Sequence, residues 1–478
     1  MKILFAASEA APYIKTGGLG DVACSLPKAL CSDPNDEVAV FLPLYGSIRD
    51  SHQFSLEYVT CFYVSLSWRN QYCGIFRANG CKGNLRYYFI DNEYYFYRDR
   101  AYGYGDDGER FAFFSKAVLE ALRYLNWYPD VIHANDWQTA MVPVFLNAFY
   151  RSIPEYQSIR TLFTIHNIEY QGKAGNDFVS DVLGLGEQWK GVMEFDGCTN
   201  LMKAALLEAD RISTVSRTYA WEIQDPYFSH GLDGILRQER GKLSGVVNGI
   251  DPEDFDPAND PLIHTPFTID QPEEKLKNKR YLQRKLGLAR RDKIPMVAMV
   301  SRLVGHKGVD LIAAVLEDLM GDDLQLVVVG TGEAQYEDLF RSYAARFPQK
   351  LSANIVFDNA LAHQLYASAD LVLMPSRQEP CGLTQLIAMR YGTVPVVRET
   401  GGLVDTVPPY DPTTGKGLGF TFKTYNAHDM LDAVRRGCAL YQDRGQWDRL
   451  RRNDMSHDSS WARSVEEYRA IYRSMLGR

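Results

Sequence analysis

The chain has 478 residues, which is too long for one hydrophobic core and favours two domains. Acidic residues outnumber basic ones by 60 to 52, which argues against nucleic acid or an anionic membrane as the main partner. The eight cysteines show no Cys-x-x-Cys pair and no zinc spacing, so we expect free thiols in a reducing cytoplasm, and no apolar stretch is long enough to span a bilayer.

The start of the chain predicts a strand, a glycine-rich turn and a helix. Residues 3–7 are apolar, residues 15–21 form the turn, and residues 22–30 have a helical pattern. The turn is not the Gly-x-Gly-x-x-Gly pattern of dinucleotide-binding folds. Lys15 stands just before two glycines, where its ammonium could reach an anion, and a tight loop with an exposed lysine is an equal explanation.

Further elements of the first half follow in order. We expect a strand at 38–42, antiparallel hairpins over 58–91 with turns at Gly74, Gly80 and Gly83, a helix at 111–122, a helix ending at 205–209, and a strand at 211–215. Residues 245–251 close this half. Residues 252–272 are rich in Pro, Asp and Thr with little periodicity, which is typical of a linker or hinge.

An aromatic run lies between the hairpins and the 111–122 helix. It includes Tyr94, Tyr95 and Phe96. Aromatic faces stack well on the apolar faces of sugar rings, and packing in the core explains the same run equally well. These three residues are therefore candidates for binding an acceptor sugar.

Two apolar strands end in polar residues. The strand from residue 130 leads into His133 and Asp136, and the strand from residue 161 leads into His166. Open α/β sheets carry their chemistry at the carboxyl ends of their strands. Asp136 and His166 are therefore candidate site residues, whereas His133 is equally well explained as a hydrogen-bonded core group.

The second half alternates strands and helices and so predicts another doubly wound sheet. The expected strands are 296–300, 324–330, 354–358, 370–374 and 394–397, and the last helix runs from 461 to about 475 with an apolar stripe. We assign residues 1–250 to a first domain, 251–272 to a hinge and 273–458 to a second domain.

Three turns of the second half have ligand-binding character. Glu379 lies in a turn before a helix that we expect to open at Gly382, and Thr400, Gly401 and Gly402 repeat the arrangement. Arg302 and Lys307 follow the 296–300 strand. Cations beside free backbone amides make a diphosphate pocket.

Six motifs in register resemble the bacterial glycogen synthase and plant starch synthase family. They begin at Lys15 (KTGGLGDV), His133 (HANDW), Thr164 (TIHN), Ser301 (SRL, with Lys307 following), Pro375 (PSRQEPCGLTQ) and Thr400 (TGGL). The resemblance implies the GT-B architecture, in which two Rossmann-like domains face across a deep cleft and the helix at 461–476 crosses back to the first domain. It also implies glucose transfer from ADP-glucose to the non-reducing end of an α-1,4-glucan such as glycogen, with retention of configuration and without a metal or cofactor.

The resemblance also implies a role for each matched residue. Lys15, Gly18 and Asp21 lie at the donor diphosphate, Arg302 and Lys307 neutralise it, and Thr400, Gly401 and Gly402 hold its distal phosphate. Asp136, His166 and Asn167 face the glucosyl unit. Glu379 and the amides of Cys381, Gly382 and Leu383 hold the sugar hydroxyls, while Gly330 and Gly332 lie at the nucleoside. Where many GT-B enzymes have a second glutamate this chain has Ile387, so we assign ribose recognition to Gln385.

No residue is an obvious covalent nucleophile, so a front-face reaction is the favoured expectation, with fixed cations in place of a divalent ion. Two other functions stay open. One is a related retaining transferase that uses UDP-glucose or a small acceptor, and the other is a catalytically silent glucan-binding homologue.

Overall fold

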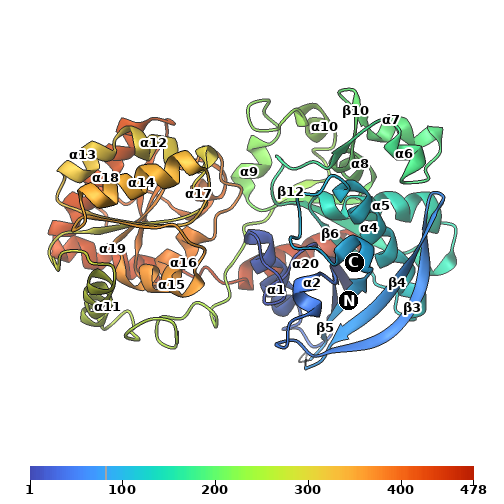
Figure 1. Cartoon of the computed structure of the whole chain (residues 1–478), viewed down its shortest axis with the longest axis horizontal. Coiled ribbons are helices and arrows are strands. Elements are labelled where there is room, and N and C mark those ends of the chain that lie inside the picture. Colours follow the sequence, from blue (N-terminus) through green and yellow to red (C-terminus); the bar gives the residue numbers. More distant parts are fainter. Residues whose placement is uncertain (81–82, 478) are drawn as a thin grey trace. The chain divides into compact units, whose positions relative to one another are not determined.

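The computed structural model describes residues 1–80 and 83–477 (Figure 1). The chain forms two compact units. The first contains Met1–Asn248 together with the segment from Trp461 on, and the second contains Gly249–Ser460. Cys81 lies outside the described residues, and the seven described cysteines are free thiols.

The first unit is built on a nine-stranded sheet in the order β12-β11-β7-β6-β1-β2-β5-β4-β3. Its strands are β1 (Lys2–Ala6), β2 (Glu37–Pro43), β3 (Leu56–Leu66), β4 (Arg69–Ala78), β5 (Leu85–Asp91), β6 (Val131–Asn135), β7 (Arg160–Ile165), β11 (Arg211–Thr214) and β12 (Leu243–Gly245). The pairs β3–β4 and β4–β5 are antiparallel and the other pairs are parallel. A small sheet joins β8 (Lys173–Ala174), β9 (Glu194–Phe195) and β10 (Cys198–Asn200).

The described part of this unit also contains helices. They are α1 (Gly18–Leu30), α2 (Gly46–Arg49), α3 (Glu93–Phe96), α4 (Asp107–Tyr124), α5 (Met141–Phe145), α6 (Phe178–Asp181), α7 (Lys190–Met193), α8 (Leu201–Glu208), α9 (Arg217–Glu222), α10 (Asp233–Gln238) and α20 (Ala462–Leu476). The last helix, α20, docks within this unit through polar anchors. Arg469 pairs with Asp36 at 3.1 Å, and the Tyr472 hydroxyl lies 2.8 Å from Nδ1 of His133. His133 is therefore a core group.

The second unit has a parallel six-stranded sheet in the order β15-β14-β13-β16-β17-β18. The strands are β13 (Met296–Val300), β14 (Gln325–Val329), β15 (Leu351–Asn354), β16 (Leu371–Met374), β17 (Val394–Arg398) and β18 (Phe420–Phe422). The helices are α11 (Pro272–Lys285), α12 (Val309–Ala314), α13 (Leu316–Gly321), α14 (Ala334–Arg346), α15 (Asn359–Ser368), α16 (Thr384–Arg390), α17 (Gly401–Thr406), α18 (Ala427–Gln442) and α19 (Arg444–Ser456). Helices α12, α14 and α18 cover one face, and α11, α15 and α16 cover the other (Figure 1).

Several expected elements differ in the structure. Gly74 is not a turn: it lies inside β4, opposite Cys61 and Asp91. The strand expected at 354–358 ends at Asn354, and Asp358 instead caps α15 by accepting a hydrogen bond from the Leu361 N–H. Strand β18 was not expected, because its three residues are too few to show a period.

The segment 251–272, expected to be a linker, packs on the second unit. Ile263 and Phe267 are buried in its core. The Asp260 carboxylate accepts hydrogen bonds from the Tyr391 hydroxyl at 2.6 Å and lies 2.8 Å from Nδ1 of His363. These contacts fasten the segment to α15 and to the end of α16.

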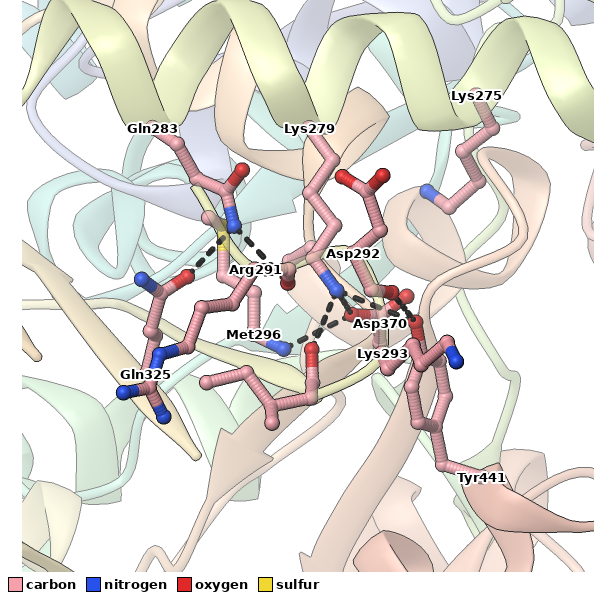
Figure 2. Close-up of polar contacts among 12 residues, drawn as sticks. Lys275, Lys279, Gln283, Arg291, Asp292, Lys293, Met296, Gln325, Asp370 and Tyr441 are labelled. Carbon is pink, nitrogen blue, oxygen red and sulfur yellow. Dashed lines mark hydrogen bonds and ion pairs between the residues drawn. The ribbon is translucent and has the colours of Figure 1, made fainter. Parts of the chain in front are cut away.

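A buried polar row on α11 ties that helix to the amino ends of three strands (Figure 2). Nζ of Lys279 donates to Asp370 at 2.6 Å, and Asp370 also accepts from the Met296 N–H at 2.8 Å. Nε2 of Gln283 donates to Gln325 at 2.8 Å. Met296, Gln325 and Asp370 stand where β13, β14 and β16 begin. This row therefore lies at the amino ends of the strands, on the opposite side of the sheet from their carboxyl ends. It is a structural network.

Asp454 in α19 is a buried carboxyl group whose ionisation should affect the stability of the fold. It is fully buried, and neither carboxyl oxygen has a hydrogen-bond partner among the described residues. Burial raises the pKa of Asp454 well above its ordinary value. The fold therefore holds the proton more tightly than the unfolded chain does, so this group's contribution to stability falls as pH rises from about 4 towards the folded-state pKa.

We therefore expect Asp454→Asn to melt at a higher temperature than the parent at pH 8, with a gain that shrinks towards pH 4.5. Thermal unfolding of both proteins across this pH range is the measurement. A variant that is less stable than the parent at pH 8 would show that the carboxylate is compensated in the fold.

Candidate active site

A largely desolvated ion pair lies at the carboxyl ends of two neighbouring strands of the second unit. Nζ of Lys307 is 2.8 Å and 2.6 Å from the two carboxylate oxygens of Glu379. The Ser376 hydroxyl donates to the same carboxylate at 2.8 Å. The Glu379 side chain is 8% exposed and that of Lys307 is 20% exposed. Both charges are therefore held in fixed positions with little competition from water.

Strand order explains why residues 72 positions apart meet. Lys307 ends a short 3₁₀ turn after β13, and Glu379 lies in the turn after β16. The two strands pair in parallel, so their carboxyl ends share one edge. Gly308, with φ of 75°, completes the arrangement: a Cβ atom there would meet the Pro375 carbonyl oxygen at 2.1 Å. Only glycine lets the two turns pack this closely.

The turn before α16 presents free amides beside this pair. The helix begins at Thr384, not at the expected Gly382, which has a φ of 76°. The N–H groups of Gly382 and Leu383 donate to no group that the structure describes. Both residues line a cavity of about 50 Å³ together with Lys307 and Glu379. The cavity thus combines a cation, a carboxylate and amide donors.

Two backbone amides of the turn before α17 bond within the protein, whereas the sequence predicted that they bind a phosphate. The Thr400 N–H donates to the Arg398 carbonyl at 2.9 Å, and the Gly402 N–H donates to the Glu379 carbonyl at 3.1 Å. These two amides are engaged within the chain, which corrects the expectation that all three amides face a phosphate. A Cβ atom on Gly401, whose φ is 48°, would meet the Glu379 carbonyl oxygen at 2.0 Å. This turn therefore braces the Glu379 turn.

Gln385 is also a bracing residue. Its side chain is buried, and Nε2 donates to the carbonyls of Cys381 and Gly382 at 3.0 Å and 2.9 Å and to the Thr406 hydroxyl at 3.1 Å. The expectation that it recognises a ribose is wrong, because its amide group is turned into the protein. Cys381 is buried in the same turn.

The other candidates of the second unit lie at the same sheet edge. Arg302 follows β13 and is exposed, with its guanidinium 3.5 Å from Nε2 of His306. Gly330 and Gly332 follow β14, where the Gly332 N–H donates to Glu337 at 2.9 Å. Both glycines pack against backbone carbonyls of the segment that carries Arg302.

In the first unit, Asp136 follows β6 with an unusual backbone φ of 58°. Its carboxylate accepts hydrogen bonds from the backbone N–H groups of His166 at 2.7 Å and Asn167 at 3.3 Å. Burial raises the pKa of Asp136 to about 7, although these two amides oppose the shift. A strained backbone and a perturbed carboxyl group are typical of functional sites.

His166 is held as a neutral imidazole. Its Nε2 lies 2.9 Å from the Asn135 side-chain oxygen, while Nδ2 of Asn135 donates to the Ala6 carbonyl at 3.0 Å. This arrangement places the imidazole proton on Nε2. Burial lowers the pKa of His166 to about 3. The imidazole is therefore suited to hydrogen bonding and not to supplying a proton near neutral pH.

The glycine-rich turn places Lys15 beside Asp21 and Gly18 at the first position of α1. Nζ of Lys15 is 2.8 Å from the Asp21 carboxylate, and both side chains are partly exposed. Glu9, which was not among the predicted site residues, lies buried behind this turn. Its position in the segment that follows the carboxyl end of β1 is the signal that could have identified it.

The aromatic candidates separate by exposure. Tyr94 is 65% exposed, but Tyr95 and Phe96 are completely buried. Tyr95 and Phe96 pack against Phe113 of α4. The expectation that they stack on an acceptor sugar is wrong, because they belong to the core. Only Tyr94 of the three has a free face.

Neither a candidate metal-binding cluster nor a candidate membrane-spanning helix occurs among the described residues. They contain no group of three or more His, Cys, Asp or Glu side chains placed to hold a metal ion. No helix among residues 1–80 and 83–477 is long and apolar enough to cross a membrane.

Comparisons with known proteins match the whole chain. Residues 2–238 match the family model of the starch synthase catalytic domain, and residues 284–453 match glycosyl transferases group 1. A glycogen synthase of Clostridium acetobutylicum is 48% identical over all of both chains, and one of Bacillus cereus is 46% identical over all of both.

Solved structures give the same result. The catalytic domain of starch synthase IV from Arabidopsis thaliana, bound to ADP and acarbose, superposes with a TM-score of 0.92 at 33% identity, covering 100% of this chain and 99% of that one. A sucrose-phosphate synthase from Thermosynechococcus elongatus, at 16% identity and a TM-score of 0.64 over 100% of this chain and 99% of its own, shares the fold. The predicted GT-B fold is confirmed.

Proposed function

Because the chain belongs to the glycogen and starch synthase family of glycosyltransferases, we propose that it transfers glucose from ADP-glucose to the non-reducing end of an α-1,4-glucan such as glycogen, with retention of configuration. Residues 273–458 form the donor side in this proposal. Residues 1–250, with the helix at 461–476, form the acceptor side.

The observation that carries the proposal is the Lys307–Glu379 pair, at 2.6 Å, beside the free amides of Gly382 and Leu383. When the bond between glucose and diphosphate breaks, negative charge develops on the phosphate and positive charge on the sugar. A fixed ammonium stabilises the first, and a fixed carboxylate stabilises the second. The amides suit sugar hydroxyls.

The remaining assignments follow the family resemblance. Arg302 supports Lys307 at the diphosphate, and Gly330 and Gly332 approach the nucleoside. In the first unit, Lys15 contacts the diphosphate, Asp21 orients Lys15, and Asp136, His166 and Asn167 face the glucosyl unit. Fixed cations take the place of a divalent ion, so activity should survive EDTA.

Donor choice is the direct test. ADP-glucose should give a far higher kcat/KM than UDP-glucose with glycogen as acceptor, measured as release of the nucleoside diphosphate in EDTA. Equal specificity constants would favour the related UDP-glucose transferase, and no release from either donor would favour a silent glucan-binding protein. A glucan-free reaction corrects for donor hydrolysis.

Asp136 should give the reaction a pH dependence. Because the pKa of Asp136 is raised to about 7, kcat/KM should rise with pH through about 7 if the carboxylate is the active form. Asp136→Asn keeps an acceptor oxygen for the two amides but cannot ionise. We expect it to lose the acidic limb and on the order of 10² in activity.

The thermal stability of Asp136→Asn tests the raised pKa of Asp136 independently of activity. A raised folded-state pKa means that ionising Asp136 weakens the fold as pH rises from about 4 to 7, so Asp136→Asn should melt above the parent at pH 8. Asp454→Asn is the matched control: it removes another buried carboxyl group and should keep the acidic limb. An unchanged pH profile in Asp136→Asn would exclude this role.

A further inference from the structure

Glu9 is a buried carboxylate that the proposed reaction does not use. It lies in the segment that follows β1, separated from the strand by Ala7 and Ser8, and the residue is 3% exposed. One oxygen, Oε2, accepts two hydrogen bonds from Thr16, one from the backbone N–H and one from the hydroxyl, both at 2.6 Å. Hydrogen bonds to a carboxylate at this length are among the strong ones in proteins. They tie an exposed loop to the buried segment that follows the core strand β1.

Thr16 is the immediate neighbour of Lys15, so this tie acts on the residue that carries the cation. The stem of Lys15 packs over Gly20, where a Cβ atom would lie 3.0 Å from Cγ of the lysine. Its ammonium lies 2.8 Å from Asp21. Thr16 itself is exposed and lacks core packing of its own. The Lys15 backbone is thus held from two sides. The Ile14 N–H donates to the Ala10 carbonyl at 3.1 Å before it, and Thr16 bonds to Glu9 after it.

We propose that Glu9 is a positioning residue for the donor: by holding Thr16 it fixes where Lys15 presents its ammonium to the diphosphate. This inference rests on the proposed function, because it takes Lys15 as a donor contact. Glu9 itself touches no substrate in it. Burial raises the pKa of Glu9, which is the cost of placing a carboxylate where it can hold a loop from behind.

Donor kinetics with glycogen at saturation test the inference. Glu9→Ala should raise the KM for ADP-glucose about 10-fold and change kcat by less than about 3-fold. Glu9→Gln keeps one acceptor oxygen for Thr16, so its KM for ADP-glucose should rise less than that of Glu9→Ala. Thr16→Val removes the hydroxyl, one of the two hydrogen-bond donors to Glu9, and should raise the KM for ADP-glucose about 3-fold. Thr16→Ser keeps both hydrogen-bond donors and should have the KM of the parent.

A double variant distinguishes positioning from general structure. If Glu9 acts through Lys15, then Lys15→Gln with Glu9→Ala should have the same donor KM as Lys15→Gln alone. Asp210→Ala is a matched control, because Asp210 accepts from the N–H and hydroxyl of Thr161 at 2.8 Å and 3.1 Å at the start of β7, the opposite edge of the same sheet. It should lower the melting temperature and leave the donor KM unchanged.

The outcomes distinguish the positioning role of Glu9 from the donor role of Lys15. A raised KM in Lys15→Gln with an unchanged KM in Glu9→Ala, or multiplicative losses in the double variant, overturns the inference and leaves the proposed function standing. An unchanged KM in Lys15→Gln overturns both the donor role of Lys15 and the inference built on it. A KM raised equally by Asp210→Ala would reduce Glu9 to a residue of general stability.

Discussion

Replacing Lys307 with glutamine should lower kcat by on the order of 10³-fold with ADP-glucose and glycogen. The ammonium lies 2.6 Å from the Glu379 carboxylate, and the Lys307 side chain is only 20% exposed, so the ammonium is already oriented before charge develops on the departing phosphate. Loss of one such donor typically removes about 3–4 kcal/mol of transition-state stabilisation. Because the loss belongs to the transition state, kcat should fall more than the donor KM rises. Initial rates over a range of donor concentrations measure both.

A matched lysine controls for the loss of a charge from this unit. Nζ of Lys350 donates to the carbonyls of Met320 at 2.6 Å and Asp322 at 2.5 Å, just before β15 and at the opposite edge of the sheet. Lys350→Gln should destabilise the unit and leave kcat within about 3-fold of the parent. If Lys307→Gln also stays within 10-fold, the ammonium is a structural partner of Glu379 and no more.

Glu379→Gln should lower turnover by at least about 100-fold, equivalent to roughly 2.7 kcal/mol. Glutamine keeps the shape of the side chain but removes the charge and replaces one acceptor oxygen with a donor nitrogen. That exchange opposes hydrogen bonds from sugar hydroxyls and removes the charge that favours a cationic sugar. Near-normal turnover would show that Glu379 serves only to shape the turn.

Stability must be measured beside turnover, because Glu379→Gln leaves Lys307 without its counter-charge. The double variant with Lys307→Gln removes both charges. It should recover stability relative to either single variant, while its turnover stays as low as that of Lys307→Gln. Asp292→Asn breaks another pair of this unit, with Arg280 at 2.6 Å, and should keep normal turnover.

Much of the secondary structure could be predicted from the sequence, because buried parallel strands are continuous apolar runs. Residues 296–300 and 394–397 show this, and both are strands in the structure. The errors have physical reasons. Residues 351–354 form an edge strand that is only partly buried, so its apolar signal is weak. Gly74 looked like a turn because glycine is common in turns, yet antiparallel neighbours on both sides hold it in β4.

The chemistry of the site was visible in the motifs, since Lys307, Glu379, Asp136 and His166 each follow an apolar strand. Residue type does not reveal which way a side chain points. Tyr95 and Gln385 were plausible ligand contacts by type, and the fold buries both.

By itself the sequence determined the family, the fold class and the side chains that carry charge to the strand ends, because local apolar runs and motif spacing encode them. Only the tertiary structure decided which of those groups meet. Strand order sets Lys307 against Glu379 across 72 residues, and the turn after β1 folds back so that Glu9 holds Thr16. The first contact depends on which strands become neighbours, and that is a property of the whole sheet that no local stretch of sequence contains. The second joins residues only seven positions apart and depends on how the turn between them folds.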